Sequence, residues 1–224
     1  MSHQPPILLV HGLHMSGLFM HPLARRLVQA GFITHTPSYH SLTRPIEAHS
    51  QRLHEYLTHH HDINKPLHMV GHSLGGLVIR HFLFNYPMWQ VHRCVTLGTP
   101  HQGSICAQYG NRLLSMLVHH AYPNALDGTC VHPKDTQIEF GVIAGTRPFG
   151  IGLPILAYHT HRHCLTDDAS IHDGTVYLSE THLAYAKDYL TLPVSHTGLL
   201  TDKTTASQTA YFLKHGQFDG HQQK

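Results

Sequence analysis

Ser73 lies in the chain's clearest chemical motif. The sequence Gly71-His-Ser-Leu-Gly75 fits the pattern Gly-x-Ser-x-Gly, with an apolar segment before it and an amphipathic segment after it. A serine on a tight strand-to-helix turn projects its hydroxyl above the sheet, and the flanking glycines remove side chains that would collide. The N-terminus of the following helix favours negative charge that develops nearby. This spacing predicts that Ser73 is a nucleophile for acyl transfer.

A serine nucleophile requires a base, and a histidine late in the chain is expected to supply it. When the serine lies on such a turn, the chain order is serine, acid, histidine. The late histidines are His182, His196, His215 and His221. His196 follows the last expected strand, at the carboxyl end of the sheet, where open parallel sheets place their active sites. We therefore predict that His196 is the general base.

The acid of the triad is expected between Ser73 and His196, after the expected strand at 140–144. The acids that fit best are Asp167, Asp168 and Asp173. Asp173 precedes a glycine and a short β-prone stretch, which places its carboxylate on a turn. Such an acid fixes the imidazole tautomer and stabilises the imidazolium. We predict Asp173 for this role and keep Asp168 as the alternative, because a long loop can bring either residue to His196.

An oxyanion hole requires two backbone N–H groups that point to one place. One should come from Leu74, directly after the nucleophile, and the other from the loop after the first strand. That loop reads His11-Gly-Leu-His14, and its glycine allows the backbone to turn inward. We predict the N–H groups of Leu13 and Leu74 as the two donors.

These residues fall at the ends of elements that alternate along the chain. Short apolar runs predict strands at 7–10, 32–33, 67–70, 91–97, 140–144 and 189–192. Amphipathic patterns and end signals predict helices at 22–30, from Pro45 onward, at 74–84 and at 202–213. Strands that alternate with such helices predict an α/β fold with a parallel sheet covered on both faces. No linker divides the chain, so residues 1–224 are expected to form one domain.

Two segments interrupt this alternation. Residues 108–137 contain an apolar helix at 113–118 and then a turn-rich loop, and residues 145–172 form a long loop rich in glycine and proline. Long loops are usually functional or mobile. We expect 108–137 to be a lid or cap over an acyl pocket, with a packed core helix as the equal alternative. Residues 150–156 are expected to line an acyl site.

Composition excludes several classes of protein. The 224 residues include 15 Lys and Arg, 13 Asp and Glu, and 27 His, for a net charge of +2 at pH 7. This small and dispersed charge argues against a nucleic-acid partner. No transmembrane segment or secretory signal is expected, since no apolar stretch is long enough and the first residues are not basic. The four cysteines lack CxxC spacing, so we expect reduced thiols and a cytoplasmic location.

Five segments in order resemble the α/β-hydrolase lipases and esterases, especially the small bacterial ones. They are 8–12, 71–76, 96–104, 173–176 and 196–200, and they span nearly the whole chain. The resemblance implies a minimal α/β-hydrolase fold with a roughly six-stranded, mostly parallel sheet. It also implies a Ser73–Asp173–His196 triad, with Leu13 and Leu74 as oxyanion donors.

The expected activity is hydrolysis of a small-molecule or lipid carboxylic ester through an acyl-enzyme, with no cofactor and no metal. Thioester hydrolysis and acyl transfer use the same triad and are the alternatives. A histidine-rich metal-binding protein is an alternative of a different class. It would rest on the clusters 59–62 and 159–164, the second with alternating histidines on one side of an extended segment.

The remaining histidines are expected to replace lysine and glutamate on the surface, while His11, His14, His72 and His101 are expected to shape the site. Protonation of all 27 histidines near pH 6 would raise the net charge from +2 toward +29. Stability and solubility should therefore depend strongly on mildly acidic pH.

Overall fold

A six-stranded sheet forms the centre of the computed structural model, which describes residues 4–113, 122–133 and 137–220. The strand order is β2-β1-β3-β4-β5-β6, and every pairing between these neighbours is parallel. The strands are β1 (Ile7–Val10), β2 (Thr34–His35), β3 (Leu67–His72), β4 (Val91–Leu97), β5 (Glu139–Gly145) and β6 (Asp188–Leu192). The expected α/β architecture is confirmed.

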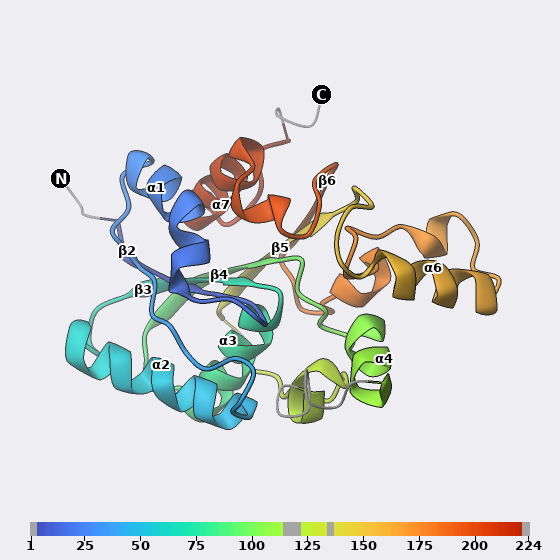
Figure 1. Ribbon diagram of the computed structural model, residues 1–224. Helices are drawn as coiled ribbons and strands as arrows, with labels where there is room; N and C mark the ends of the chain where they lie inside the picture. The colour runs from blue at the N-terminus through green and yellow to red at the C-terminus, as the bar shows by residue number, and fades with distance from the viewer. Residues whose placement is uncertain (1–3, 114–121, 134–136, 221–224) are drawn as a thin grey trace.

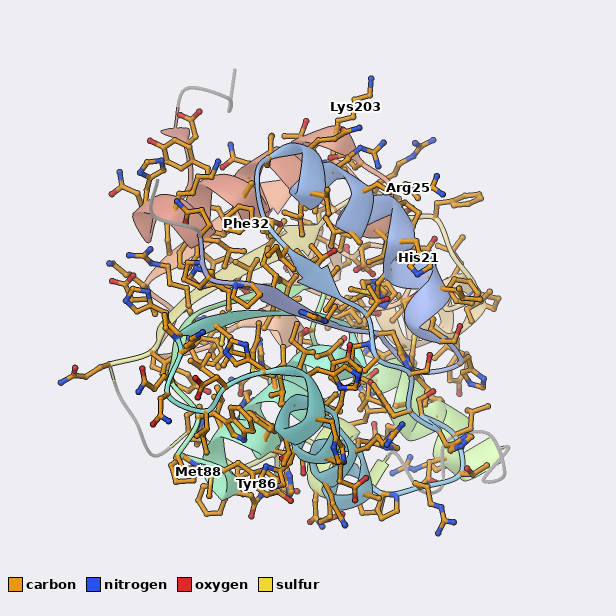
Figure 2. All side chains as sticks on the ribbon, turned by 90° about the vertical axis from the view of Figure 1, so that its left-hand side faces the viewer. His21, Arg25, Phe32, Tyr86, Met88 and Lys203 are labelled. Atoms are coloured by element: carbon orange, nitrogen blue, oxygen red, sulfur yellow. The ribbon has the colours of Figure 1, made fainter. Side chains whose placement is uncertain are left out.

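Helices cover both faces of this sheet (Figure 1). One face carries α1 (His21–Gln29) and α7 (Lys203–His215), and the other carries α2 (Ile46–His60) and α3 (Leu74–Asn85). Figure 2 looks at the β2 edge and shows α1 and α2 on opposite sides of it. Two further helices, α4 (Ile105–Leu113) and α6 (Leu153–Arg162), contact each other beyond one end of the sheet. The short helices are η1 (Gly17–Met20), η2 (Tyr122–Leu126), η3 (Asp168–Ser170), η4 (Leu178–Thr181) and η5 (Gly198–Leu200).

The apolar core has two layers, one on each face of the sheet. Side chains alternate between the faces of a strand, so Ile7 and Leu9 of β1 pack in the α1–α7 layer, while Leu8 and Val10 pack in the α2–α3 layer. All four are buried. Burial on both faces explains why β1 is a continuous apolar run rather than an alternating one. The strands therefore form a fixed base for the loops at their carboxyl ends.

The structure differs from expectation in three segments. The second strand begins at Thr34 rather than Phe32, because the amide of Phe32 donates to the Leu27 carbonyl at the end of α1 (3.1 Å). The segment 145–172 is not one irregular loop, since it contains α6 and η3. The proline near the start of α6 lies in its first turn, where a missing N–H breaks no helical hydrogen bond. The expected helix at 113–118 lies outside the described residues beyond Leu113.

All four cysteines are free thiols. Burial raises the pKa of Cys130 to about 11 and that of Cys106 to about 12, so both thiols stay protonated at neutral pH. Within the described ranges, no helix is long and apolar enough to cross a membrane. The cytoplasmic location stays a prediction.

Candidate active site

Ser73 occupies a tight turn between β3 and α3. Its backbone has φ 54° and ψ −125°, a conformation that L-residues rarely adopt. A Cβ atom at Gly75 would lie 2.2 Å from the Val10 carbonyl oxygen, and one at Gly71 would lie 2.6 Å from the Gly76 nitrogen. Only glycine fits at these two positions, as the motif predicts.

Hydrogen bonds from β4 and the segment after it hold the turn. The amide of Ser73 donates to the Leu97 carbonyl (2.9 Å), and the hydroxyl of Thr99 donates to the Ser73 carbonyl (2.9 Å). The backbone of the nucleophile candidate is therefore held at both its N–H and its C=O group.

Asp173 and His196 form a buried pair. Nδ1 of His196 donates to Oδ2 of Asp173 at 2.7 Å, and the amide of His196 donates to the Asp173 carbonyl at 2.9 Å. The other carboxylate oxygen, Oδ1, accepts from the amides of Thr175 (3.0 Å) and Val176 (2.8 Å). Asp173 is 1% exposed and His196 is 6% exposed. This pair leaves Nε2 of His196 as the ring nitrogen available for a proton from elsewhere.

The alternative acid and the other late histidines lie elsewhere. Asp168 is exposed and begins η3, and Asp167 precedes it. His182 and His215 are exposed, while His221 lies outside the described residues. Of the candidates that sequence reasoning left open, the structure brings Asp173 and His196 together.

The loop after β1 is held by His11. Its Nδ1 donates to the Gly12 carbonyl (2.9 Å), and its Nε2 accepts from the Tyr39 amide (3.2 Å). The Tyr39 hydroxyl donates to the His11 carbonyl, and the two rings stack at 4.0 Å. Burial lowers the pKa of His11, which keeps the ring neutral for this bonding. In the described part of the chain, no hydrogen bond occupies the N–H of Leu13 or Leu74.

A mostly apolar cavity of about 590 Å³ lies beside the nucleophile candidate. Ser73, His196, Leu13 and His14 all line it. Its apolar walls come from η1, from α4 and from the segment that leads into α6, with Phe19, Ala107, Phe149, Ile151, Leu153 and Ile155. The expectation that 150–156 lines this site agrees with its position here.

Residues 6–135 match the family model described as palmitoyl protein thioesterase. This match covers more than half of the chain. The chain belongs to the palmitoyl protein thioesterase family. It is thus an α/β-hydrolase of the esterase, lipase and thioesterase type, as the motifs indicated. No curated protein sequence matches it significantly.

Solved structures similar to this palmitoyl protein thioesterase family member support the same fold. A Bacillus licheniformis lipase in mature form aligns with TM-score 0.73 and 20% identity, covering 96% of this chain and 92% of that chain. A metagenomic carboxyl esterase aligns with TM-score 0.68 and 15% identity, covering 88% and 65%. Polyneuridine aldehyde esterase aligns with TM-score 0.58 and 12% identity, covering 94% and 99%. At these identities the likeness concerns the fold alone.

Sequence reasoning missed Gly98 in this family member's site. Gly98 has φ +56°, and a Cβ atom there would lie 3.0 Å from His196 Nδ1 and 3.1 Å from Asp173 Oδ2. It directly follows β4 within the 96–104 segment, where sequence reasoning singled out His101 but not Gly98. A glycine at the carboxyl end of a central strand is the signal that could have identified it.

His72 was expected to shape the site and supports the loop that carries His196. Its Nε2 donates to the His196 carbonyl at 2.9 Å. Burial lowers the pKa of His72 to about 3, so the ring is neutral at pH 7. A neutral His72 adds no second positive charge beside His196, whose ring centroid lies 4.7 Å away.

The histidine cluster at 159–164 is not an extended segment. It ends α6, where alternate residues no longer point to one side, since helical side chains turn by about 100° per residue. His159 instead packs against His163, four residues on, at 4.4 Å between centroids. Among the residues that the structure describes, no group of three His, Cys, Asp or Glu side chains is arranged to hold a metal ion.

Proposed function

We propose that the chain is a serine hydrolase that cleaves carboxylic esters through an acyl-enzyme. The observation that carries this proposal is that His196, paired with the buried Asp173, lines the same cavity as Ser73 on its strained turn. Ser73 is the nucleophile, His196 the general base and Asp173 the group that orients the imidazole. The N–H groups of Leu13 and Leu74 hold the oxyanion.

The reaction proceeds in two acyl transfers. His196 Nε2 takes the proton of Ser73 Oγ while that oxygen attacks the ester carbonyl, and the same proton then leaves with the alcohol. A water molecule repeats the sequence on the acyl-enzyme, with His196 again as base, and releases the acid. Because the bond from Asp173 to Nδ1 fixes the ring tautomer, Nε2 is the nitrogen that can act in both steps.

The apolar cavity supports an acyl group of some length as substrate. Phe149 is 66% exposed and Ile151 is 90% exposed, and both line the cavity. Apolar side chains at the mouth of a cavity bind an apolar chain favourably, since burial removes their surface from water. We infer a preference for esters of medium or long acyl chains over acetyl esters.

Thioester hydrolysis is the second candidate, because the matching family is described as a palmitoyl protein thioesterase. With the same triad, Ser73 can attack a thioester carbonyl, and a thiol then leaves in place of an alcohol. Matched decanoyl esters and thioesters with the same leaving-group skeleton would rank the two reactions by kcat/KM.

The decisive experiment compares wild type with Ser73→Ala on 4-nitrophenyl decanoate. We expect Ser73→Ala to lose turnover and labelling by a fluorophosphonate, which reacts with activated serines. Ser207→Ala, an exposed serine on α7, is the matched control and should keep both. Near wild-type turnover by Ser73→Ala would overturn the proposal.

A further inference from the structure

A second cavity adjoins the catalytic one. It has a volume of about 920 Å³ and lies between the segment 38–44 and the first half of α2. His14 and Met15 line both cavities, so the two lie side by side at the loop that follows β1. An ester bound at Ser73 with its acyl chain in the apolar cavity would direct its other half toward this second space.

The second cavity is more polar than the catalytic one and has two arginines in its lining. Arg44 and Arg52 line it and are exposed, and one carboxylate, Glu55, lines it as well. Arg52 lies 3.6 Å from Glu55, and both side chains are about half exposed at 56% and 46%. Such a surface pair is weak and leaves the arginine free to rearrange. The lining of this cavity therefore carries two positive guanidinium groups and one negative carboxylate, which gives it a net positive charge.

His49 adds a buried polar atom at the base of this cavity. The side chain is 1% exposed, and its Nε2 has no hydrogen-bond partner among the described residues. The ring lies 4.6 Å from the Tyr39 ring. Burial lowers the pKa of His49 to about 4, so the ring is neutral at pH 7 and its Nε2 can form one hydrogen bond, to which a hydroxyl group is suited. Buried polar atoms without partners are rare and often mark a place for a ligand or water.

From these observations we propose that the second cavity is a leaving-group subsite for a hydroxylated alcohol that carries an anionic group such as a phosphate. Arg44 and Arg52 bind the anion, and Nε2 of His49 forms a hydrogen bond with a hydroxyl. This inference rests on the proposed function, because it assumes attack by Ser73 on the ester carbonyl. Hydrolysis breaks the acyl–oxygen bond, water supplies the hydroxyl of the released acid, and the phosphorylated alcohol leaves with the proton.

The test uses 1-decanoylglycerol and 1-decanoylglycerol 3-phosphate, both below their critical micelle concentrations. The two share one acyl chain and differ by one phosphate. We expect wild type to show the higher kcat/KM with the phosphate ester. Arg44→Gln and Arg52→Gln should each lower that value about three- to fivefold, while 1-decanoylglycerol and 4-nitrophenyl decanoate are unaffected. Glu55→Gln should raise it, and added salt should weaken the preference.

Arg25→Gln is the matched control, because Arg25 is an exposed arginine on α1, across the sheet from α2 (Figure 2). It should leave the preference unchanged. Equal effects of Arg25 and Arg44 substitutions would indicate general attraction by surface charge and would overturn the subsite. No preference for the phosphate ester in wild type would overturn it too, while Ser73-dependent cleavage of the nitrophenyl ester would leave the proposed function intact.

A binding measurement separates the two proposals if no ester is cleaved. Calorimetry with Ser73→Ala protein and 1-decanoylglycerol 3-phosphate should show binding that weakens by a similar factor when Arg44→Gln is added. If the Arg44 and Arg52 substitutions leave the affinity unchanged, the subsite proposal is overturned, whatever the catalytic result.

Discussion

The two carboxylate oxygens of Asp173 have different partners. Oδ1 accepts two backbone N–H groups, and Oδ2 faces His196. The backbone bonds fix the carboxylate plane, so the direction of Oδ2 is set before any substrate binds. A single residue thereby determines which nitrogen of His196 carries its proton.

Asp173→Asn should lower kcat for 4-nitrophenyl decanoate by about 10³- to 10⁴-fold, because an amide can stabilise the wrong imidazole tautomer. Asp168→Asn should have little effect, since Asp168 is exposed on η3. Steady-state kinetics and circular dichroism of both variants check this. A large loss in the Asp168 variant alone would return the acid to the alternative position.

Gly98→Ala should lower activity through steric intrusion. The new methyl group would press on Nδ1 of His196 and Oδ2 of Asp173. Gly31→Ala is the matched control, because Gly31 also has positive φ (+94°) but a Cβ atom there would meet nothing within 4 Å. Both variants should lose about 1–2 kcal/mol of unfolding free energy from backbone strain. Only Gly98→Ala should lose kcat, and equal kcat losses would contradict this prediction.

Glu180 joins α4 to the segment that follows Asp173. Its carboxylate accepts from the amide of Ile105, the first residue of α4, and from the amide of Tyr177, which precedes η4. Both walls of the catalytic cavity include residues of these segments, with Ala107 on one side and Val176 on the other. Burial raises the pKa of Glu180 to about 8, and the two amide bonds oppose this shift because they favour the charged carboxylate.

Glu180→Gln should therefore destabilise the protein by about 1–3 kcal/mol, because an amide nitrogen cannot accept and one buried N–H loses its partner. Urea unfolding at pH 7 measures the change. Glu55→Gln is the control on an exposed carboxylate and should stay within about 0.5 kcal/mol. A Glu180→Gln protein as stable as wild type would show that this link carries little free energy.

Histidines form part of the protein's interior. Seven of the described histidines are buried: His11, His49, His68, His72, His81, His101 and His196. The surface role expected from composition is wrong for His49, His68 and His81. Burial lowers the pKa of His49 and of His68 to about 4, so both are neutral at pH 7. Acid sensitivity is still expected, but its cause is the cost of burying charge.

The unfolding free energy should fall as the pH falls from 7 to 5, by at least about 2 kcal/mol. Below pH 6.5 the histidines of the unfolded chain bind protons, whereas the buried histidines of the folded chain stay neutral. Their contribution to the unfolding free energy is therefore complete above pH 6.5 and is lost as the pH falls toward 4. Glu180 acts in the opposite direction, since its raised pKa gives stability that is lost as the pH rises through about 8. The stability maximum should lie near neutral pH.

Urea unfolding across this pH range, at low and at 0.5 M salt, checks the cause. Repulsion among surface histidines would be screened by salt, at a Debye length of a few ångströms, whereas the penalty for buried histidines would persist. A pH dependence abolished by salt would restore the surface explanation. His68→Leu should reduce the acid slope, because His68 is 1% exposed and its Nδ1 is among the buried atoms without a partner.

The sequence predicted the sheet and the turn at Ser73 well because local signals determine them. Continuous apolar runs mark doubly covered strands, and the two glycines of the turn are required by contacts below 3 Å. The acid was ambiguous because a long loop separates the candidates from His196. Gly98 was missed because its role depends on residues about 75 and 98 positions later in the chain. Histidine burial could not be inferred, since the same residue type suits surface and interior.

The backbone of Ser73 also implies a conflict between folding and chemistry at one position. A non-glycine residue at φ 54° and ψ −125° costs about 1–3 kcal/mol, which glycine would not incur. Selection for a durable fold alone would favour glycine there, and only a use for the hydroxyl favours serine. Ser73→Gly should thus be inactive yet unfold at a higher urea concentration than wild type. The serine at position 73 would then lower the unfolding free energy of the protein while supplying its reactive hydroxyl.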